Sequence, residues 1–563
     1  MSGVAGQPGQ RLVSEPDRLP DGFTVRLDRR TRRLAGAGSD GRVGSDGRVG
    51  SDGRVGSDGR AGVALLGLSP GRLLHLAPAA RRLLGDGGEL VVRDSTGARL
   101  ARRLLDAGVA HPVVPPCRDV PGGPGESEVT AVVPVRDRPD GLRRLLAALA
   151  DTAPGLAEVI VVDDGSADPT AHREVAERWA VGRAGRVRLI RHPCARGPAA
   201  ARNTGLSAAG TELIACLDSD VVPEPGWLAP LRAHLADPAV ALAAPRIVAL
   251  PAELGPGQAA GPGWLDRYEA LRSSLDLGPD AAPVVPRTRV AYVPSAALLL
   301  RRAALPLGEP AFDESMRVAE DVDLVLRLHA AGWRLRYEPA ARVAHQHRVR
   351  PVGWWTRKAF YGTGAAPLAL RHPGSVPPLV LAPWAAAVCV LVGVQRRSGL
   401  LGATGVTAMA WWRLRRTLTP AGGARLREPG RVAALLIGLG LVSAANQAAG
   451  LLVRHWWPAA AVGCLLSRRV RRAVLVAALA EGLADWYRHR PGPVGRAGPG
   501  GADRADRADG ADEAVRLDPV RYLLAHRADD LGYGAGLWWG AARSRTLAPL
   551  RPELTRARVR SAR

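Results

Sequence analysis

The chain has few cysteines, and none of them is arranged for a disulfide framework or a zinc site. Its 563 residues include five widely scattered cysteines: Cys117, Cys194, Cys216, Cys389 and Cys464. No two of them form a Cys-x-x-Cys pair or show the spacing of zinc ligands. An odd, scattered set is typical of a reducing compartment. The first thirty residues also lack the apolar run of a secretory signal, so we expect the protein to face the cytoplasm.

Lysine is almost absent, because Lys358 is the only one, and arginine therefore carries the formal net charge of +24. Aromatic residues make up only 4% of the chain. No nucleic-acid recognition motif accompanies the arginines, and uniform use of arginine with abundant alanine and glycine is typical of coding bias. We therefore expect no nucleic-acid partner, and we expect the charge to favour anionic lipids or diphosphate substrates.

The length predicts about three folded units. Near-copies of the hexapeptide GSDGRV fill residues 38–61. Each copy offers at most one valine to a core, so the segment predicts a flexible insertion. Changes in composition along the chain predict a small N-terminal α+β unit (15–112) that contains this insertion, a Pro/Gly-rich linker (113–128), a central domain (129–350), an apolar helical region (351–490), a charged linker (491–513) and a C-terminal helical hairpin (514–550).

The sequence of the N-terminal unit predicts a strand, a helix, a second strand and a second helix, in this order. Strands are expected at 23–27 and 90–92, and a helix at 97–107. After a Ser-Pro start signal, six residues fall on one helical face: Leu73, Leu74, Leu76, Ala80, Leu83 and Leu84. This order resembles the winged-helix peptide-recognition domains of peptide-modifying systems. An appendage that packs against the rest of the chain and binds no ligand is the alternative.

The central domain predicts an α/β fold with a doubly wound, mostly parallel sheet. Residues 129–135 and 158–162 are continuous apolar, β-branched runs, as strands buried on both faces should be. A helical pattern at 139–149 lies between them. Alternation of this kind places ligands outside the carboxyl ends of the strands, so the residues that follow each run are candidates for ligand contact.

Three later segments are apolar and separated by arginine-rich turns: 377–394, 432–453 and 470–483. A bilayer needs about twenty apolar residues per helix. The first segment is short and the other two contain polar residues, so peripheral or re-entrant membrane association competes with true spans. Tryptophan pairs near arginines favour a membrane interface. An ordinary helical core with aromatic packing is the other interpretation.

Two acids, Asp163 and Asp164, end the second apolar run and precede a Gly-Ser turn. At a strand end they could hydrogen-bond the base and ribose of a nucleotide. The same residues could instead cap the next helix. Between this run and the next strand, Arg202 and Asn203 follow a stretch of small residues and could contact phosphate or base. Structural salt bridging is the alternative for Arg202.

Another buried strand, 213–217, ends in an Asp-x-Asp formed by Asp218 and Asp220. Hard divalent cations prefer oxygen ligands and leave room for substrate phosphates. This pair therefore predicts a site that holds Mg²⁺ or Mn²⁺ against a diphosphate. An Asp-x-Asp on a protein surface is also frequent by chance.

A further acidic cluster includes Asp321 and Asp323 at the start of a predicted helix. The helix is expected to turn the apolar residues Leu324, Leu328 and Ala331 inward, which leaves the acids near the cleft. A carboxylate there could take the proton from a sugar or phenol hydroxyl. Downstream, His345 and His347 supply imidazoles, one of which could complete the metal site.

Taken in order, the runs VVPVRDR, VVDDGS, ARGPAAARN, LDSD and AEDVDL, followed by a late histidine, resemble the family-two glycosyltransferases of the GT-A fold over about residues 128–350. The resemblance implies one in-line displacement with inversion, and Asp321 as the catalytic base. It implies a metal held by Asp218, Asp220 and His345. The residues that it assigns to the nucleotide sugar are Pro134, Asp163, Asp164, Arg202, Asn203 and Asp218. No Gln-x-x-Arg-Trp follows the base region, which disfavours a processive polysaccharide synthase.

A narrower resemblance covers most of the chain. The runs LPDGFTVRLD, SPGRLLHLAPAARRLL, RTRVAYVPSAALLLRR and FYGTGAAPLALRHPG are similar to the mycofactocin-system glycosyltransferases. This family is understood to attach glucose, from a nucleotide-sugar donor, to a peptide-derived redox cofactor in actinobacteria. The resemblance implies a UDP-sugar donor, with UDP-glucose expected, and a peptide-derived acceptor.

Two other functions remain compatible with the sequence. One is a cell-envelope glycosyltransferase with a lipid-linked acceptor, which true membrane spans would favour. The other is a non-catalytic protein that binds peptide through its N-terminal unit and nucleotide through its central domain. The intact acids at Asp218, Asp220 and Asp321 argue against the second.

Overall fold

The computed structural model describes residues 18–34, 64–68, 71–85, 87–113, 125–181, 187–250, 263–306, 308–347, 350–419, 426, 428–490 and 516–555. The chain divides into two compact units, and each unit combines segments that are far apart in sequence. The first contains Val114–Leu379 and Ala449–Glu553, and the second contains Arg18–Val113 and Val380–Ala448. The GSDGRV repeat, most of the 113–128 linker and the 491–513 linker lie outside the described residues.

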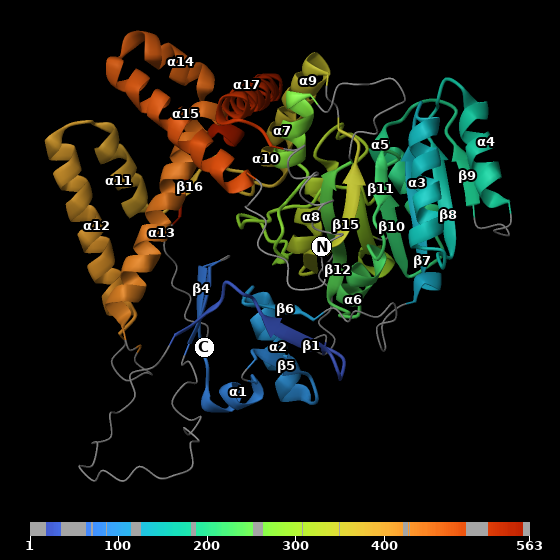
Figure 1. The fold of residues 1–563 in the computed structure, drawn as a ribbon, viewed down its shortest axis with the longest axis horizontal. Coiled ribbons are helices and arrows are strands. Elements are labelled where there is room, and N and C mark those ends of the chain that lie inside the picture. Colours follow the sequence, from blue (N-terminus) through green and yellow to red (C-terminus); the bar gives the residue numbers. More distant parts are fainter. Residues whose placement is uncertain are drawn as a thin grey trace, which may run out of the picture. The chain divides into compact units, whose positions relative to one another are not determined.

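A nine-stranded mixed sheet forms the centre of the first unit (Figure 1). Its order is β11-β15-β12-β14-β10-β7-β8-β9, and β13 pairs with β15. The neighbours β10, β7, β8 and β9 are parallel, as predicted, whereas β14 runs antiparallel to β10 and β12. The strands are β7 (Val129–Val135), β8 (Glu158–Asp163), β9 (Val187–Arg191), β10 (Leu213–Leu217), β11 (Val221–Pro223), β12 (Val240–Ala249), β13 (Ala282–Pro283), β14 (Ala297–Arg301) and β15 (Arg334–His345).

The helices of the first unit come from both of its segments. Those of the first segment are η2 (Glu126–Glu128), α3 (Pro139–Thr152), α4 (Pro169–Ala180), α5 (Pro198–Ala208), α6 (Leu228–Leu235), α7 (Trp264–Arg272), η3 (Arg302–Ala304), α8 (Glu320–Ala330), α9 (Pro351–Thr363) and α10 (Ala365–Arg371). Those of the second segment are the π-helix η4 (Leu451–His455), α14 (Trp457–Leu466), α15 (Arg468–His489), α17 (Pro519–Arg543) and η5 (Ala548–Leu550).

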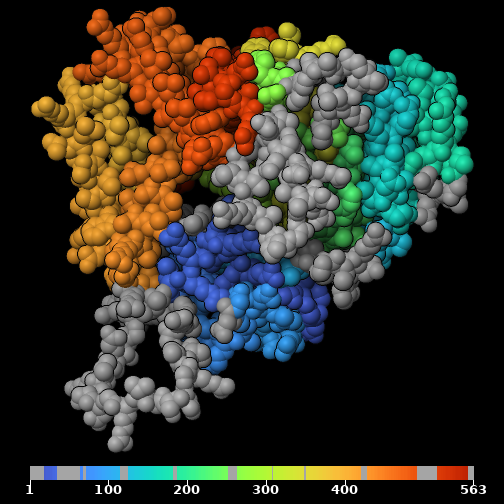
Figure 2. Space-filling view, viewed as in Figure 1, coloured from blue at the N-terminus to red at the C-terminus, as the bar shows by residue number. Residues whose placement is uncertain are grey.

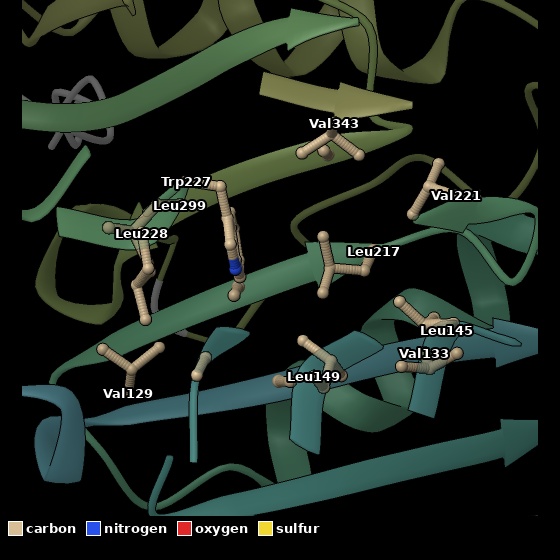
Figure 3. Packing of buried hydrophobic residues seen from close by; sticks show 14 of the residues in the cluster. Val129, Val133, Leu145, Leu149, Leu217, Val221, Trp227, Leu228, Leu299 and Val343 are labelled. Carbon is tan, nitrogen blue, oxygen red and sulfur yellow. The ribbon is translucent and has the colours of Figure 1, made fainter. Parts of the chain in front are cut away.

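Alternate residues of the strands face two separate cores, because successive side chains of a strand point to opposite sides of the sheet. One core joins Val129, Val133 and Leu217 to Leu145 and Leu149 of α3, together with residues of α6 (Figure 3). The other core holds residues of α5 and α8 against the opposite face. Helices therefore cover both faces, and the continuous apolar runs of the sequence are explained by burial on both sides.

The parallel strands β7, β8 and β10 all end at one edge of the sheet, since parallel strands share a direction. The loops that follow Val135, Asp163 and Leu217 therefore lie at this edge. The start of α8 joins them, because Asp321 is bonded to the segment that leads into β14. Leu324 and Leu328 of α8 are buried, as expected, but Ala331 is exposed and lies just beyond the helix, where the chain turns away from the core.

The C-terminal segment differs from the expected helical hairpin. Residues Pro519–Arg543 form one continuous helix, α17, and only the short η5 follows it. Glycines of α17 are sites of close helix packing: a Cβ on Gly536 would lie 1.7 Å from the carbonyl oxygen of Ala359 in α9. Glycine is needed there because the two backbones touch. The expected 351–490 region is also divided, since α9 and α10 belong to the first unit and 380–448 to the second.

The second unit begins with two small antiparallel sheets. The first has the order β5-β1-β6, formed by Glu89–Val91, Thr24–Leu27 and Ala110–Pro112, and the helix α2 (Ser95–Asp106) supplies residues to its core. The second joins β2 (Arg32–Leu34), β3 (Ala64–Leu68) and β4 (Gly71–His75). The expected helix over 73–84 is wrong in its first half, because Leu73 and Leu74 pair with β3 in a hairpin and only α1 (Pro78–Leu83) is helical. A short apolar run is compatible with both the 3.6-residue period of a helix and the two-residue period of a strand.

Three apolar helices complete the second unit: α11 (Pro383–Gly393), α12 (Arg397–Thr417) and α13 (Pro429–Gly450). The short strands are β16 (Val380–Leu381) and β17 (Glu553–Leu554). Both lie at positions in the sequence where one unit ends and the other begins. Within the described residues, the continuous helix Pro429–His455 is long and apolar enough to cross a bilayer, although 28% of its most apolar window is buried. One helix of this kind is weak evidence for a span.

Candidate active site

The two acids after β8 are both bonded to neighbouring backbone and side chains. Asp163 is buried, pairs with Arg191 and accepts a hydrogen bond from the amide of Ser166. Asp164 accepts hydrogen bonds from the amides of Arg196 and Gly197 at 2.9 and 2.8 Å. It also pairs with His192, 2.8 Å away. Burial alone would raise the pKa of Asp164, but these hydrogen bonds hold the pKa below its ordinary value. The structure thus gives both acids a role in shaping the loop, and their contact with nucleotide stays a prediction.

Arg202 joins the Asp-x-Asp motif to the start of α8. Its guanidinium group is 3% exposed and donates to Asp218 Oδ1 at 2.6 Å and to Glu320 Oε1 at 3.0 Å. It also lies over the ring of Phe312, 5.4 Å from the ring centre. These contacts support the salt-bridge interpretation, because the two acids already occupy the Arg202 side chain. Its expected contact with phosphate is untested.

Asn203, the neighbour of Arg202, is bonded to a different segment. Its side-chain amide donates to the carbonyl oxygen of Phe312 at 2.8 Å and to Glu314 at 3.1 Å, and its oxygen accepts from the amide of Phe312 at 2.9 Å. The side chain therefore fixes the segment before α8. Pro134, the other residue expected at the nucleotide sugar, is buried in β7 opposite Val162.

Asp220 lies between an arginine and a histidine that come from distant parts of the chain. Its Oδ2 atom pairs with Arg138 at 2.5 Å, and its Oδ1 atom lies 3.5 Å from Nε2 of His345 at the end of β15. The antiparallel pairing of Val221 with His345 brings the two together. Asp220 Oδ1 and His345 Nδ1 are buried and have no hydrogen-bond partner. Buried polar atoms without partners are rare and indicate a missing ion, water or ligand.

Asp321 lies in the first turn of α8, where its carboxylate accepts two backbone hydrogen bonds. The amide of Ser295 donates to Oδ2 at 3.1 Å and the amide of Val322 to Oδ1 at 2.8 Å. Burial, and then the charge of Glu320, raise the pKa of Asp321 to about 6. The preceding Ala319 has φ of 66°, a left-handed conformation that alanine rarely adopts and that is concentrated at functional sites. A carboxyl group of this kind is suited to accept a proton near neutral pH.

Several residues of this region were missed by the sequence analysis. Glu320 was quoted only within a motif and Arg138 only within another, yet Glu320 pairs with Arg202 and Arg138 pairs with Asp220. His347 lies 3.6 Å from Glu269, which also binds Lys358 at 2.9 Å. The signal that could have identified this last group is that Lys358 is the only lysine. A single lysine in an arginine-rich chain indicates a site where arginine cannot replace it.

The residues that could hold a divalent cation are Asp218, Asp220 and His345. They offer oxygen and imidazole donors, and two of the donor atoms have no partner within the protein. A tighter group of possible ligands in the described chain is formed by Glu481, His526 and Asp530. There Arg527 pairs with both Glu481 and Asp530, as Arg202 and Arg138 pair with Asp218 and Asp220. The Asp-x-Asp group is the better candidate because Arg202 also joins it to Glu320, the neighbour of Asp321.

Comparison with known proteins places this geometry in a family. Residues 130–283 match Glycosyl transferase family 2, and residues 213–445 match Glycosyl transferase family group 2. The chain is 45% identical over 539 residues to the pre-mycofactocin glycosyltransferase of Mycobacterium tuberculosis, which covers 95% of this chain and 99% of that protein. The chain belongs to the pre-mycofactocin glycosyltransferases of family 2. It is accordingly a glycosyltransferase, and the predicted family and GT-A type of α/β fold are confirmed.

More distant relatives share only part of the chain. The succinoglycan biosynthesis protein ExoU of Rhizobium meliloti is 32% identical over 216 residues, which is 37% of this chain and 59% of that protein. Among solved structures, the mannosyltransferase PcManGT of Pyrobaculum calidifontis, in complex with GDP-Man and Mn²⁺, is 19% identical with a TM-score of 0.33. It covers 64% of this chain and 87% of its own.

Proposed function

We propose that the protein transfers a sugar from a nucleoside diphosphate sugar to a peptide-derived acceptor, with inversion at the sugar carbon. The observation that carries the proposal is the junction of Asp321 with the Asp-x-Asp motif through Glu320 and Arg202. This junction puts one carboxyl group of raised pKa beside one group of candidate metal ligands. One carboxyl base suits a single displacement, whereas retention through a covalent intermediate needs a second carboxylate as nucleophile.

In the proposed step, the acceptor hydroxyl attacks the first carbon of the donor sugar. Its proton passes to the Asp321 carboxylate, the new carbon–oxygen bond forms, and the bond from that carbon to the diphosphate breaks. The leaving nucleoside diphosphate keeps the electron pair of the broken bond. General-base catalysis of this kind contributes about 10² to 10⁴-fold, and positioning of the two substrates contributes further.

A divalent cation, Mg²⁺ or Mn²⁺, fits the donor set of Asp218, Asp220 and His345, in which Asp220 Oδ1 and His345 Nδ1 lack partners. When bound, the cation supplies positive charge to the departing diphosphate. Arg202 and Arg138 orient the two aspartates for this role. Arg138 is itself cationic and its side chain is 39% exposed, so it is accessible to an anionic ligand such as a phosphate.

The donor we propose is UDP-glucose and the acceptor the mycofactocin precursor. The acceptor is supported by the family, since a relative that matches almost the whole chain is a pre-mycofactocin glycosyltransferase. The lipid-linked acceptor and the non-catalytic function are less consistent with the molecule. A protein that only binds its ligands does not require a carboxyl group with a raised pKa, such as that of Asp321.

We further propose that the enzyme works at the cytoplasmic surface of a membrane. Figure 2 shows α14 and α15 at the surface in orange. Large aliphatic side chains on these two helices are exposed, and Leu465 and Leu466 at the turn are 84% and 82% exposed. Arginines follow directly at positions 468, 469, 471 and 472. Exposed aliphatic side chains beside arginines are typical of helices that insert into the surface of an anionic bilayer.

The proposal is tested with the purified full chain, pre-mycofactocin and a panel of nucleotide sugars. We expect UDP-glucose to be consumed with release of UDP. Asp220→Ala should abolish the effect of Mn²⁺ on UDP affinity measured by calorimetry, because the variant lacks the carboxylate with the unpartnered oxygen. The control Asp140→Ala removes an exposed acid on α3 and should leave that effect unchanged. UDP affinity that responds to Mn²⁺ equally in both variants would exclude the metal assignment.

A further inference from the structure

The junction of helices α9 and α10 packs directly against the segment that carries Asp321. At the junction of α9 and α10, a Cβ on Gly364 would lie 2.9 Å from the side chain of Ala319, two residues before Asp321. Two residues earlier, a Cβ on Gly362 would lie 2.1 Å from the carbonyl oxygen of Tyr533 in α17. The end of α9 therefore contacts both the segment before Asp321 and the backbone of Tyr533.

Tyrosines gather around this junction although the chain has only seven of them. Tyr292 lies three residues before Ser295, whose amide binds Asp321, while Tyr361 and Tyr533 lie on α9 and α17. Tyr292 is 40% exposed, yet burial raises its pKa to about 12, with further contributions from Tyr533 and Asp321. Tyr292 thus lies close enough to Tyr533 and Asp321 for their charges to raise its pKa, and its side chain reaches solvent.

Arg454 adds a cationic group to the same place. It lies on the π-helix η4, with its guanidinium carbon 4.1 Å from the centre of the Tyr533 ring. Single π-helical turns are rare and occur frequently at functional sites. Asp530 and Asp529 hold the guanidinium group from the other side, at 3.0 and 3.4 Å. The arginine is therefore fixed in position and covers one face of the tyrosine.

A buried ion-pair network fixes the helices that carry Tyr533 and surround Arg454. Lys358 binds Glu269 at 2.9 Å and Asp529 at 3.2 Å, and the indole of Trp354 donates to Glu269 at 2.6 Å. The network joins α7, α9 and α17, and through Asp529 it reaches Arg454. Side chains that are locked in this way lose little further entropy when a ligand binds.

We propose that Tyr292, Tyr533 and Arg454 form an acceptor subsite beside Asp321, which takes an aromatic ring of the acceptor and directs its hydroxyl group to the carboxylate. The inference rests on the proposed function and adds residues to it, two of them from the segment 449–553 that closes the first unit. Tyrosine faces and guanidinium planes stack on aromatic rings. A phenol, with an ordinary pKa of about 10, also gives up its proton to a carboxylate more readily than an alcohol does.

The test compares acceptor and donor kinetics in the full-length enzyme. Tyr533→Ala should raise KM for pre-mycofactocin about tenfold and leave KM for the nucleotide sugar and its acceptor-free hydrolysis unchanged, since an aromatic contact contributes about 0.5–1.5 kcal/mol beyond its buried area. Tyr533→Phe keeps the ring and should restore KM. Tyr487→Ala is the matched control, because Tyr487 is a 61% exposed tyrosine on α15.

A second measurement identifies the class of ligand. The phenol 4-ethylphenol should compete with the acceptor more strongly than its saturated counterpart 4-ethylcyclohexanol, and Tyr533→Ala should remove the difference. Equal competition by the two compounds, or an unchanged acceptor KM in Tyr533→Ala, overturns the subsite even if transfer proceeds. If pre-mycofactocin is not glycosylated but the ring-dependent binding is present, the proposed function fails and the subsite stands.

Discussion

Replacement of Asp321 by asparagine should remove activity and, at neutral pH, stabilise the protein. The variant keeps the size of the side chain but cannot accept a proton, so transfer should fall about 10² to 10⁴-fold. Donor binding should persist, because the links from Asp321 to Asp218 run through other residues, by way of Glu320 and Arg202 and by way of the Ser295–Ala296 backbone. Loss of rate with intact UDP affinity is the first expected result.

The effect on stability follows from the raised pKa. Asp321 has a pKa of about 6 when folded and an ordinary value of 3.8. The folded state holds the proton more tightly, so stability falls as pH rises from about 4 to about 6 and stays reduced above that range. A difference of about two pKa units corresponds to about 3 kcal/mol. Asparagine removes this loss but gives up one of the two backbone hydrogen bonds, which costs about 1–2 kcal/mol.

The expected balance changes sign with pH. At pH 8 Asp321→Asn should be more stable than the parent by about 1 kcal/mol, and at pH 4 less stable by about the same amount. Urea unfolding at a series of pH values measures the difference, with Asp140→Asn as a control for an exposed acid. A stability difference that does not vary with pH would refute the raised pKa, and a variant that transfers sugar at the parental rate would refute the base.

Two further predictions concern packing and the membrane. Gly536→Ala should destabilise the protein by about 3 kcal/mol or more in thermal unfolding, because its Cβ meets the Ala359 carbonyl, whereas Gly438→Ala, with nothing within 4 Å, should stabilise it by about 0.5–1 kcal/mol. Leu465→Glu should weaken sedimentation with phosphatidylglycerol vesicles about thirtyfold, the equivalent of about 2 kcal/mol for one buried leucine. Val181→Glu, at a 77% exposed site elsewhere, should have no effect, and equal binding of both variants would argue against the α14–α15 surface.

The sheet and its ligand-bearing edge could be predicted from the sequence because they depend on local pattern. The runs 129–135 and 158–162 are apolar apart from Thr130 and Glu158, and the structure buries every position except the half-buried Glu158, on both faces of the sheet. The acids that follow a strand must lie at its end, so Asp163, Asp218 and Asp220 could be placed from sequence alone. The order of the strands and the antiparallel insertion of β14 depend on long-range pairing that no local pattern records.

The remainder of the site depends on contacts between distant residues. The pairing of β11 with β15 brings His345 to Asp220, and only the late histidine of the family motif anticipated it. Arg138 and Ser295 lie within quoted sequence runs, but no motif indicated that they would contact Asp220 and Asp321, and none indicated the partners of Lys358. A hairpin was expected at 514–550, but residues Pro519–Arg543 form one helix. Its packing depends on Gly536, which admits the backbone of α9, and this is a contact that composition does not record.

The last helix of the first unit has a consequence for how the enzyme matures on the ribosome. Lys358 and Arg454 are synthesised before α17, which carries the acids Asp529 and Asp530 that neutralise them. Until α17 leaves the ribosome, two positive charges lack these counter-charges, and the close backbone contacts of α9 have nothing to meet. The nascent chain therefore cannot complete its catalytic unit early. A chain that ends before α17 lacks Tyr533 against α9 and the acids that pair with Lys358 and Arg454.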